Sequence, residues 1–251
     1  MADSQNIQAN PVAVCLAGTM ESVLSTGHEQ GMKLVAEGSA RLCMQLKDEA
    51  LMRQYLCVTV APGLQYLQQA MTSVQNGGNE IHIEAFCQKL ASCLRVIREI
   101  IRFCDKPAGS DGASHPLSDI LNVLWPQLNG IVSIPASRQH QEVLSELLNI
   151  HGQLLSAVPD LVAPHFSGLI DLVVRAYEES HLPCALDYVA AAIEVFGENT
   201  DAAESFNQLL SHLSQCTCLY LTQERRPNEC PEVRKLQEIF FAVPIYHLSI
   251  S

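Results

Sequence analysis

Two potential metal ligands, His212 and Cys216, lie four residues apart in a stretch whose periodicity predicts a helix. This spacing places both side chains on one helical face. An imidazole nitrogen and a thiolate sulfur are common Zn²⁺ ligands, but a structural zinc site needs four. The sequence indicates no further pair of ligands, and Cys218 points away from Cys216 on a helix. We therefore predict ordinary packing at this point, with no metal and no cofactor.

The other residues that could do chemistry also lack the partners that a catalytic motif requires. His28 and Glu29 occur in GHEQG, where no second histidine completes the HExxH pattern. The chain contains neither GxxxxGK[ST] nor GxGxxG, the glycine-rich patterns that bind phosphate groups. His115, His140 and His165 lie singly near expected loops or helix starts. An enzyme is therefore the weakest of the functional hypotheses, and we expect a binding protein.

Three arginines, Arg95, Arg98 and Arg102, recur on one face of the helix predicted at 80–104. Glu99 lies four residues after Arg95 and three before Arg102, a spacing that allows ion pairs within the helix. The opposite face is apolar and consists of Phe86, Leu90, Cys93, Leu94, Ile97, Ile100, Ile101 and Cys104. The arginines form either a basic stripe for an anionic ligand or a solvated charged face, and we favour the second interpretation.

Helical periodicity runs along nearly the whole chain, and no segment shows sustained alternation of the kind that strands have. The predicted helices span about 10–26, 28–46, 48–75, 80–104, 116–133, 137–157, 159–178, 183–196, 200–223 and 231–242. We expect the third to break near Pro62 and Gly63, because proline disrupts helical hydrogen bonding. The fold class is therefore all-α.

The predicted helix at 116–133 contains the one tryptophan of the chain, Trp125, followed directly by Pro126. Its apolar stripe consists of Leu117, Ile120, Leu121, Leu124, Leu128 and Ile131, with Trp125 at the edge. Pro126 projects from the opposite side, where it should face solvent and bend the helix around its packed face.

Composition restricts the classes of partner. Among 251 residues, 15 Lys and Arg stand against 27 Asp and Glu, which gives a formal charge of −12. An acidic protein repels phosphate backbones, so we expect no nucleic acid partner, and no apolar run is long enough to insert into a membrane. Nine of the ten cysteines lie in apolar segments that are predicted to be helical, where free thiols pack as small apolar side chains. This placement indicates a reducing compartment.

The predicted helices fall into pairs whose later starts, near 116, 159 and 200, are about 40 residues apart, a period typical of HEAT and armadillo arrays. We predict an α-solenoid superhelix of about five HEAT-type pairs, at 10–46, 48–104, 116–157, 159–196 and 200–242. These pairs would form a single segment over residues 1–251. The alternative architecture is a globular helical bundle.

An ordered set of sequence features resembles the importin-β superfamily of nuclear transport receptors, in particular its transportin-SR and importin-thirteen branches. It begins with His115-Pro116 and Trp125-Pro126 followed by Leu128. The stretch from DLVAPHF to VFGEN resembles the next repeat, with Pro164, Leu169, Tyr177, Cys184 and Gly197 in matching places. CPEVRKLQEIF then resembles a loop-to-helix entry, and a weaker likeness extends the match over residues 30 to 240.

The resemblance implies a HEAT-repeat receptor, present in cytoplasm and nucleus, that carries protein cargo and is regulated by Ran in its GTP form. Ran and nucleoporins would be partners of the full-length family, whose principal Ran-binding repeats have no counterpart here. We therefore expect a central fragment, a truncated isoform or an incomplete gene product.

In the transportin-SR branch, arginines on the helix after the Trp-Pro helix bind phosphorylated Arg-Ser cargo. Here that stretch offers only Arg138, beside Glu142 and Glu146. We expect weak cargo binding at Arg138 and do not extend phosphoserine recognition to this chain. The alternative function is a general HEAT scaffold for protein interactions, with no link to Ran.

Overall fold

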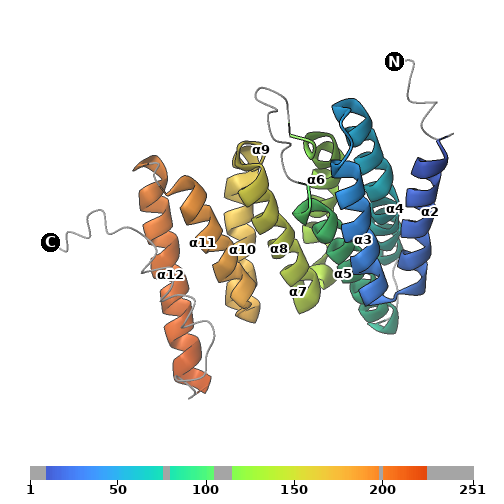
Figure 1. The fold of residues 1–251 in the computed structure, drawn as a ribbon. Coiled ribbons are helices and arrows are strands. Elements are labelled where there is room, and N and C mark those ends of the chain that lie inside the picture. The colour runs from blue at the N-terminus through green and yellow to red at the C-terminus, as the bar shows by residue number, and fades with distance from the viewer. Residues whose placement is uncertain (1–9, 76–79, 105–114, 198–199, 225–251) are drawn as a thin grey trace. The chain divides into compact units, whose positions relative to one another are not determined.

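The computed structural model describes residues 10–75, 80–104, 115–197 and 200–224, and Figure 1 shows them as coiled ribbons. No strand occurs in these ranges, so the all-α prediction is confirmed for them. The helices are α2 (Pro11–Thr26), α3 (Glu29–Met44), α4 (Glu49–Gln75), α5 (Glu80–Arg102), α6 (Ser118–Ser133), α7 (Pro135–Gln139), α8 (Gln141–Ala157), α9 (Pro159–Val162), the 3₁₀ turn η1 (Ala163–His165), α10 (Phe166–Ser180), α11 (Pro183–Phe196) and α12 (Thr200–Glu224). The helix predicted at 231–242 lies outside the described residues. None of the described helices combines the length and hydropathy that crossing a bilayer requires.

The predicted break at Pro62 is wrong, because α4 continues through this residue. Pro62 and Gly63 are both buried. A Cβ atom at Gly63 would lie 3.4 Å from Cγ1 of Ile97, so α4 and α5 pack closely here. An internal proline costs roughly 3 kcal/mol, and packing against α5 offsets that cost.

Two breaks occur where the periodicity predicted continuous helix. His140 has an extended backbone, with φ −93° and ψ 110°, and it separates α7 from α8. Pro164 lies in η1, between α9 and α10, where its missing N–H interrupts the α-helical hydrogen bonds. The apolar pattern continues across both points, because packing selects the face of a segment whether or not its helix is continuous.

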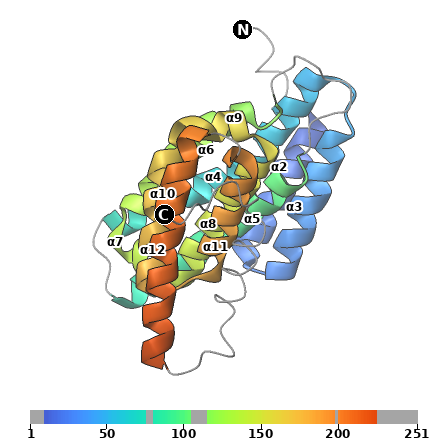
Figure 2. The same ribbon diagram turned by 90° about the vertical axis from the view of Figure 1, so that its left-hand side faces the viewer.

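Contacts between Cα atoms divide the chain into two compact units, residues 1–153 and 154–251, with the boundary inside α8. In the first unit, α2 contacts α4 and α4 contacts α6, which places these helices in one row. A second row contains α3 and α5, and each helix from α2 to α4 also contacts its successor in the chain (Figures 1 and 2). The first unit is therefore built from helical hairpins packed side by side.

The core of the first unit comes from the helical faces that the sequence predicted. All eight predicted apolar residues of α5 are buried, and so is the whole stripe from Leu117 to Ile131, with Trp125 only 7% exposed. Pro126 faces solvent, as expected. Arg53 of α4 adds polar contacts to the segment just before α6: it pairs with Glu49 at 2.7 Å and donates to the His115 carbonyl at 3.1 Å.

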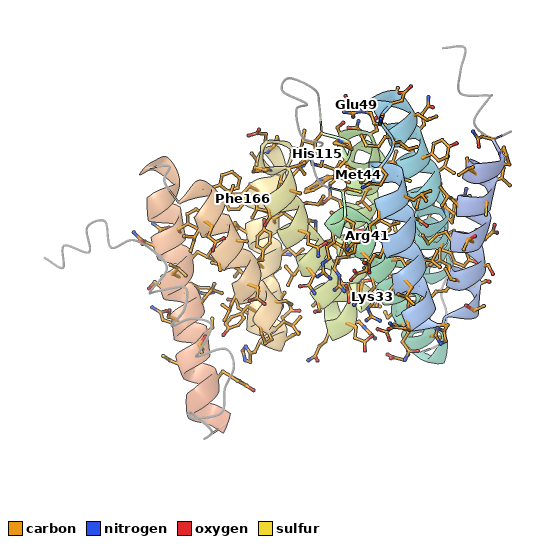
Figure 3. All side chains as sticks on the ribbon, in the orientation of Figure 1. Lys33, Arg41, Met44, Glu49, His115 and Phe166 are labelled. Atoms are coloured by element: carbon orange, nitrogen blue, oxygen red, sulfur yellow. The ribbon has the colours of Figure 1, made fainter. Side chains whose placement is uncertain are left out.

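The second unit has its own core. Helix α10 contacts both α11 and α12. Phe166, at the start of α10, lies with its ring centroid 4.9 Å from that of Phe196 and 5.9 Å from that of Phe206 (Figure 3). Tyr177 and Tyr188 are fully buried. Aromatic edge-to-face packing therefore joins the three helices of this unit.

Alanine substitutions at two glycines, one at the end and one in the middle of α2, should change the free energy of unfolding in opposite directions. Gly27 ends α2 with φ 65°, a left-handed conformation that costs an L-residue about 1–2 kcal/mol, so Gly27→Ala should lower the free energy of unfolding by that amount. Gly18 is exposed inside α2, and nothing lies within 4 Å of a Cβ placed there. Gly18→Ala should raise stability by up to about 1 kcal/mol. Urea unfolding measures both changes, and equal signs would contradict this account.

Candidate functional site

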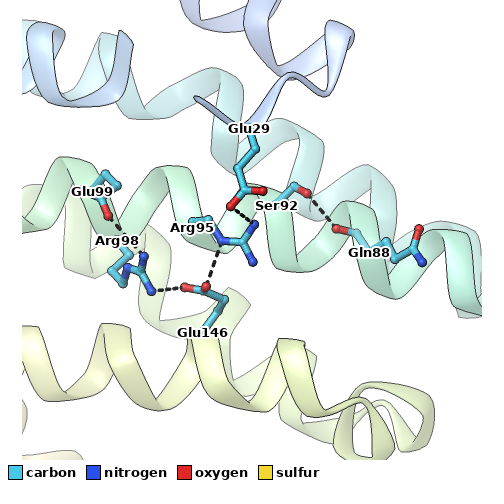
Figure 4. A network of polar contacts seen from close by, with 7 residues as sticks. All are labelled: Glu29, Gln88, Ser92, Arg95, Arg98, Glu99 and Glu146. Atoms are coloured by element: carbon cyan, nitrogen blue, oxygen red, sulfur yellow. Dashed lines mark hydrogen bonds and ion pairs between the residues drawn. The ribbon is translucent and has the colours of Figure 1, made fainter. Parts of the chain in front are cut away.

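The arginine face of α5 forms a network of ion pairs with two other helices (Figure 4). Glu146 of α8 binds two arginines at once, because Oε1 accepts from Nε of Arg95 at 3.0 Å and Oε2 accepts from Nη1 of Arg98 at 2.6 Å. Arg95 also donates to Glu29 of α3 at 2.9 Å, and Arg98 donates to Glu99 at 3.2 Å. We call this set of five residues the α5 charge network.

Four of the five members of the α5 charge network are largely covered, while the side chain of the fifth, Glu29, is 70% exposed. The side chains of Glu146 and Glu99 are only 8% and 3% exposed, and those of Arg95 and Arg98 are 26% and 20% exposed. The prediction of a solvated charged face is therefore wrong. Periodicity identified a polar face correctly, but it could not show that α3 and α8 would cover this face.

Pairing with carboxylates favours the charged form of Arg95. Burial by itself would lower the pKa of Arg95, but the carboxylates of Glu146, Glu29 and Glu142 more than compensate and raise that pKa. Buried charges are tolerated when each has a partner of opposite sign and good hydrogen-bond geometry. The guanidinium groups of Arg95 and Arg98 are thus already bound to carboxylates. They are poorly placed to act as the basic stripe for an anionic ligand that the sequence left open.

The remaining predicted arginines occupy different surroundings. Arg102 is 55% exposed and lies 3.6 Å from Oε2 of Glu99, so this predicted pair is present as a weak contact. Arg41 of α3 lies over the Phe103 ring at 4.3 Å from its centroid. Arg138 belongs to α7, but its side chain lies outside what the structure describes. Cargo binding at Arg138 stays a prediction.

A second polar cluster joins α10 and α12. Nε2 of His212 lies 2.7 Å from Oε1 of Glu178 and 3.8 Å from Sγ of Cys216. The three donor atoms all lie within 4.8 Å of one another. The sequence placed His212 and Cys216 on one helical face but missed Glu178, which comes from a different helix 34 residues earlier. A spacing rule within one helix carries no signal for such a partner.

Nine cysteines in the described part of the chain are free thiols. Burial raises the pKa of Cys93 to about 11, so this thiol stays protonated and behaves as a small apolar side chain. Cys216 differs because it belongs to a polar cluster, where burial and then the nearby Glu178 raise the pKa of its thiol. Cys15 and Cys218 are exposed, although the apolar sequence around them predicted burial.

His151 of α8 is a buried titratable group next to Trp125. The two rings meet edge to face, with centroids 5.5 Å apart. Neither ring nitrogen has a hydrogen bond of good geometry to the described residues. Burial therefore lowers the pKa of His151 to about 4, and the nearby Leu147 carbonyl opposes only part of this effect.

Comparisons with known proteins assign no family to this chain: no protein-family model matches it, and no curated protein matches it in sequence. The function therefore has to be argued from the residues and their geometry.

Removal of Glu146 tests the α5 charge network. Glu146→Ala leaves two partly buried arginines without their shared carboxylate, and we expect a loss of about 3 kcal/mol in the free energy of unfolding. Glu37→Ala is the matched control, since Glu37 pairs with Arg41 on the surface of α3 at 2.9 Å and with 30% and 61% exposure. This control should cost less than about 0.5 kcal/mol. Similar losses in denaturant unfolding would show that the network contributes no more than a surface pair.

The buried imidazole of His151 predicts a pH dependence of stability. The unfolded chain takes up a proton near pH 6.5 and the folded chain only near pH 4, so the free energy of unfolding falls as pH drops through this window. The expected total is about 3 kcal/mol, and His151→Leu should remove it. Fluorescence of the one tryptophan, Trp125, reports unfolding. The exposed His165→Gln variant should keep the parental slope, and a parental slope in His151→Leu would refute the assignment.

Proposed function

We propose that this chain is a segment of an α-solenoid nuclear transport receptor, and that it binds basic protein cargo. The observation that carries the proposal is the pair of helical rows in the first unit, α2–α4–α6 beside α3–α5. HEAT-type arrays consist of such hairpins, in which each pair contributes one outer and one inner helix, and stacking of neighbours buries a continuous core. The ordered resemblance of residues 115 to 240 to the importin-β superfamily supports the same function.

Charge supports a basic partner. The formal charge of −12 attracts basic segments and repels phosphate groups. The α5 charge network supports this as well, because the arginines that could have bound phosphorylated cargo already bind Glu146, Glu29 and Glu99. Cargo would then contact carboxylates and apolar side chains rather than arginines.

Helix α3 offers an apolar contact for such cargo. In a HEAT-type array α3 would be the inner helix, because it is the second helix of the hairpin α2–α3. Leu34 and Leu42 are 59% and 51% exposed there, one turn on either side of the exposed Gly38. Glu37 on the same helix already pairs with Arg41. The two leucines would therefore contact apolar side chains of the cargo, while the net negative charge of the chain attracts its basic groups.

Capture of cell proteins on the immobilised full chain tests the function, with and without Ran locked in its GTP form. Enrichment of basic nuclear proteins that high salt releases is the expected result, and displacement by GTP-bound Ran would support a receptor. Complexes that persist with GTP-bound Ran would fit either a general HEAT scaffold or a receptor segment without its principal Ran-binding repeats, and the same capture with a full-length receptor would decide between them. A captured set with no excess of basic proteins would contradict the proposal.

Substitutions on α3 locate the contact. Leu34→Gln and Leu42→Gln should each weaken binding of a captured basic protein by about tenfold, because they remove exposed apolar surface from the contact without changing its charge. Val123→Gln on α6 is the matched control, since Val123 is 52% exposed but belongs to the other row. Equal losses in all three variants would place the contact elsewhere.

A further inference from the structure

The Glu178–His212–Cys216 cluster brings three different metal-ligand atoms together at the surface of the second unit. Oε1 of Glu178 comes from α10, while Nε2 of His212 and Sγ of Cys216 come from successive turns of α12. The side chains of Glu178 and His212 are 43% and 44% exposed, so an ion can reach them from solvent. The cluster lies in the second unit and outside the surface that the cargo proposal uses.

Neighbouring contacts hold α10 and α12 in the register that this cluster needs. The Tyr177 hydroxyl, next to Glu178 in the chain, lies 2.5 Å from the Thr217 hydroxyl, next to Cys216, and both residues are buried. One turn farther along, the rings of His181 and Tyr220 lie with centroids 4.2 Å apart. The three ligand atoms are thus presented from two helices in a fixed register, which favours binding because little ordering remains to be done.

The distances suit a small tetrahedral ion after modest side-chain movement. With Zn–N and Zn–O near 2.1 Å and Zn–S near 2.3 Å, ligand atoms of a tetrahedral site lie about 3.3–3.6 Å apart. The 3.8 Å between His212 Nε2 and Cys216 Sγ is close to this range. The 2.7 Å between His212 and Glu178 must open by about 0.6 Å. Both of these side chains are half exposed and can adjust by rotation about their own bonds.

We propose that Glu178, His212 and Cys216 form a three-ligand site for Zn²⁺, with water in the fourth position. A nitrogen, a sulfur and an oxygen ligand together favour Zn²⁺ over Mg²⁺ or Ca²⁺, which prefer oxygen ligands alone. On binding, the Cys216 thiol releases its proton to solvent and His212 keeps its ring proton on Nδ1. The bound ion links α10 to α12 at the surface, in addition to the buried Tyr177–Thr217 contact.

Metal titrations of the full chain test this site, with a non-chelating reductant present to keep all cysteines reduced. Calorimetry with Zn²⁺ should show one tight site per chain. Co²⁺ used in its place should give a thiolate-to-cobalt charge-transfer absorption, which reports a sulfur ligand directly. If the folded arrangement binds Zn²⁺ more tightly than the unfolded chain does, as the proposal requires, the ion should also raise the unfolding temperature.

Variants separate the proposed site from adventitious binding to other thiols. His212→Ala, Cys216→Ser and Glu178→Gln should each weaken Zn²⁺ binding by at least about tenfold. Loss of a residue that only hydrogen-bonds to a metal ligand already costs at least that much. Cys216→Ser should also abolish the charge-transfer band. Cys218→Ser is the matched control, since Cys218 is exposed on the same helix but does not belong to the cluster, and it should bind like the parent.

Two results would overturn the proposal. The first is a parent chain that takes up no Zn²⁺ at micromolar concentrations, which would show that the cluster is only a hydrogen-bonded contact between α10 and α12. The second is parental affinity and stoichiometry in His212→Ala and Cys216→Ser, which would place the ion elsewhere. Since these ligands are partly exposed, the variants should fold, and far-UV circular dichroism verifies this before each titration. Neither result bears on cargo capture, so the two proposals fail independently.

Discussion

The double ion pair that Glu146 makes with Arg95 and Arg98 constrains how α5 packs against α8 in the first unit. An apolar face tolerates small rotations of a helix, because dispersion contacts have little directional preference. A carboxylate that is 8% exposed does not, since it loses its hydration and must keep both guanidinium partners. Rotation of α5 about its axis, or sliding of α5 along α8, would therefore break these hydrogen bonds. Arg95 extends the same constraint to α3 through Glu29.

This constraint also shapes what the surface can bind. An arginine that neutralises an internal carboxylate is withdrawn from the surface, so α5 presents much less free positive charge than its sequence indicates. The acidic residues in excess remain available to solvent and partners, which agrees with the proposal of basic cargo. The exposed leucines of α3 offer apolar surface for the proposed contact.

The α5 charge network and the Glu178–His212–Cys216 cluster differ in how they respond to their surroundings. In the α5 charge network Glu146 and Glu99 are buried and both arginines already pair with carboxylates, so a further ion would have to displace an existing pair. The Glu178–His212–Cys216 cluster is half exposed and has no cation among its three members unless His212 is protonated. Each cluster joins helices that are distant in sequence, but only the second leaves a place for an ion from solvent. This difference follows from burial and from the balance of charges.

The sequence by itself determined the class of fold, most helix positions and the buried faces of α5 and α6. The apolar faces of α5 and α6, with Trp125 inside and Pro126 outside, follow from a period of 3.6 residues, which is a local property of the chain. Only the tertiary structure decided that α4 continues through Pro62, that Arg95 meets Glu29 66 residues away, and that Glu178 completes a cluster with His212 and Cys216. Periodicity reports which way a side chain points from its own helix. Its partner depends on the register between helices, which the packing of the whole core sets.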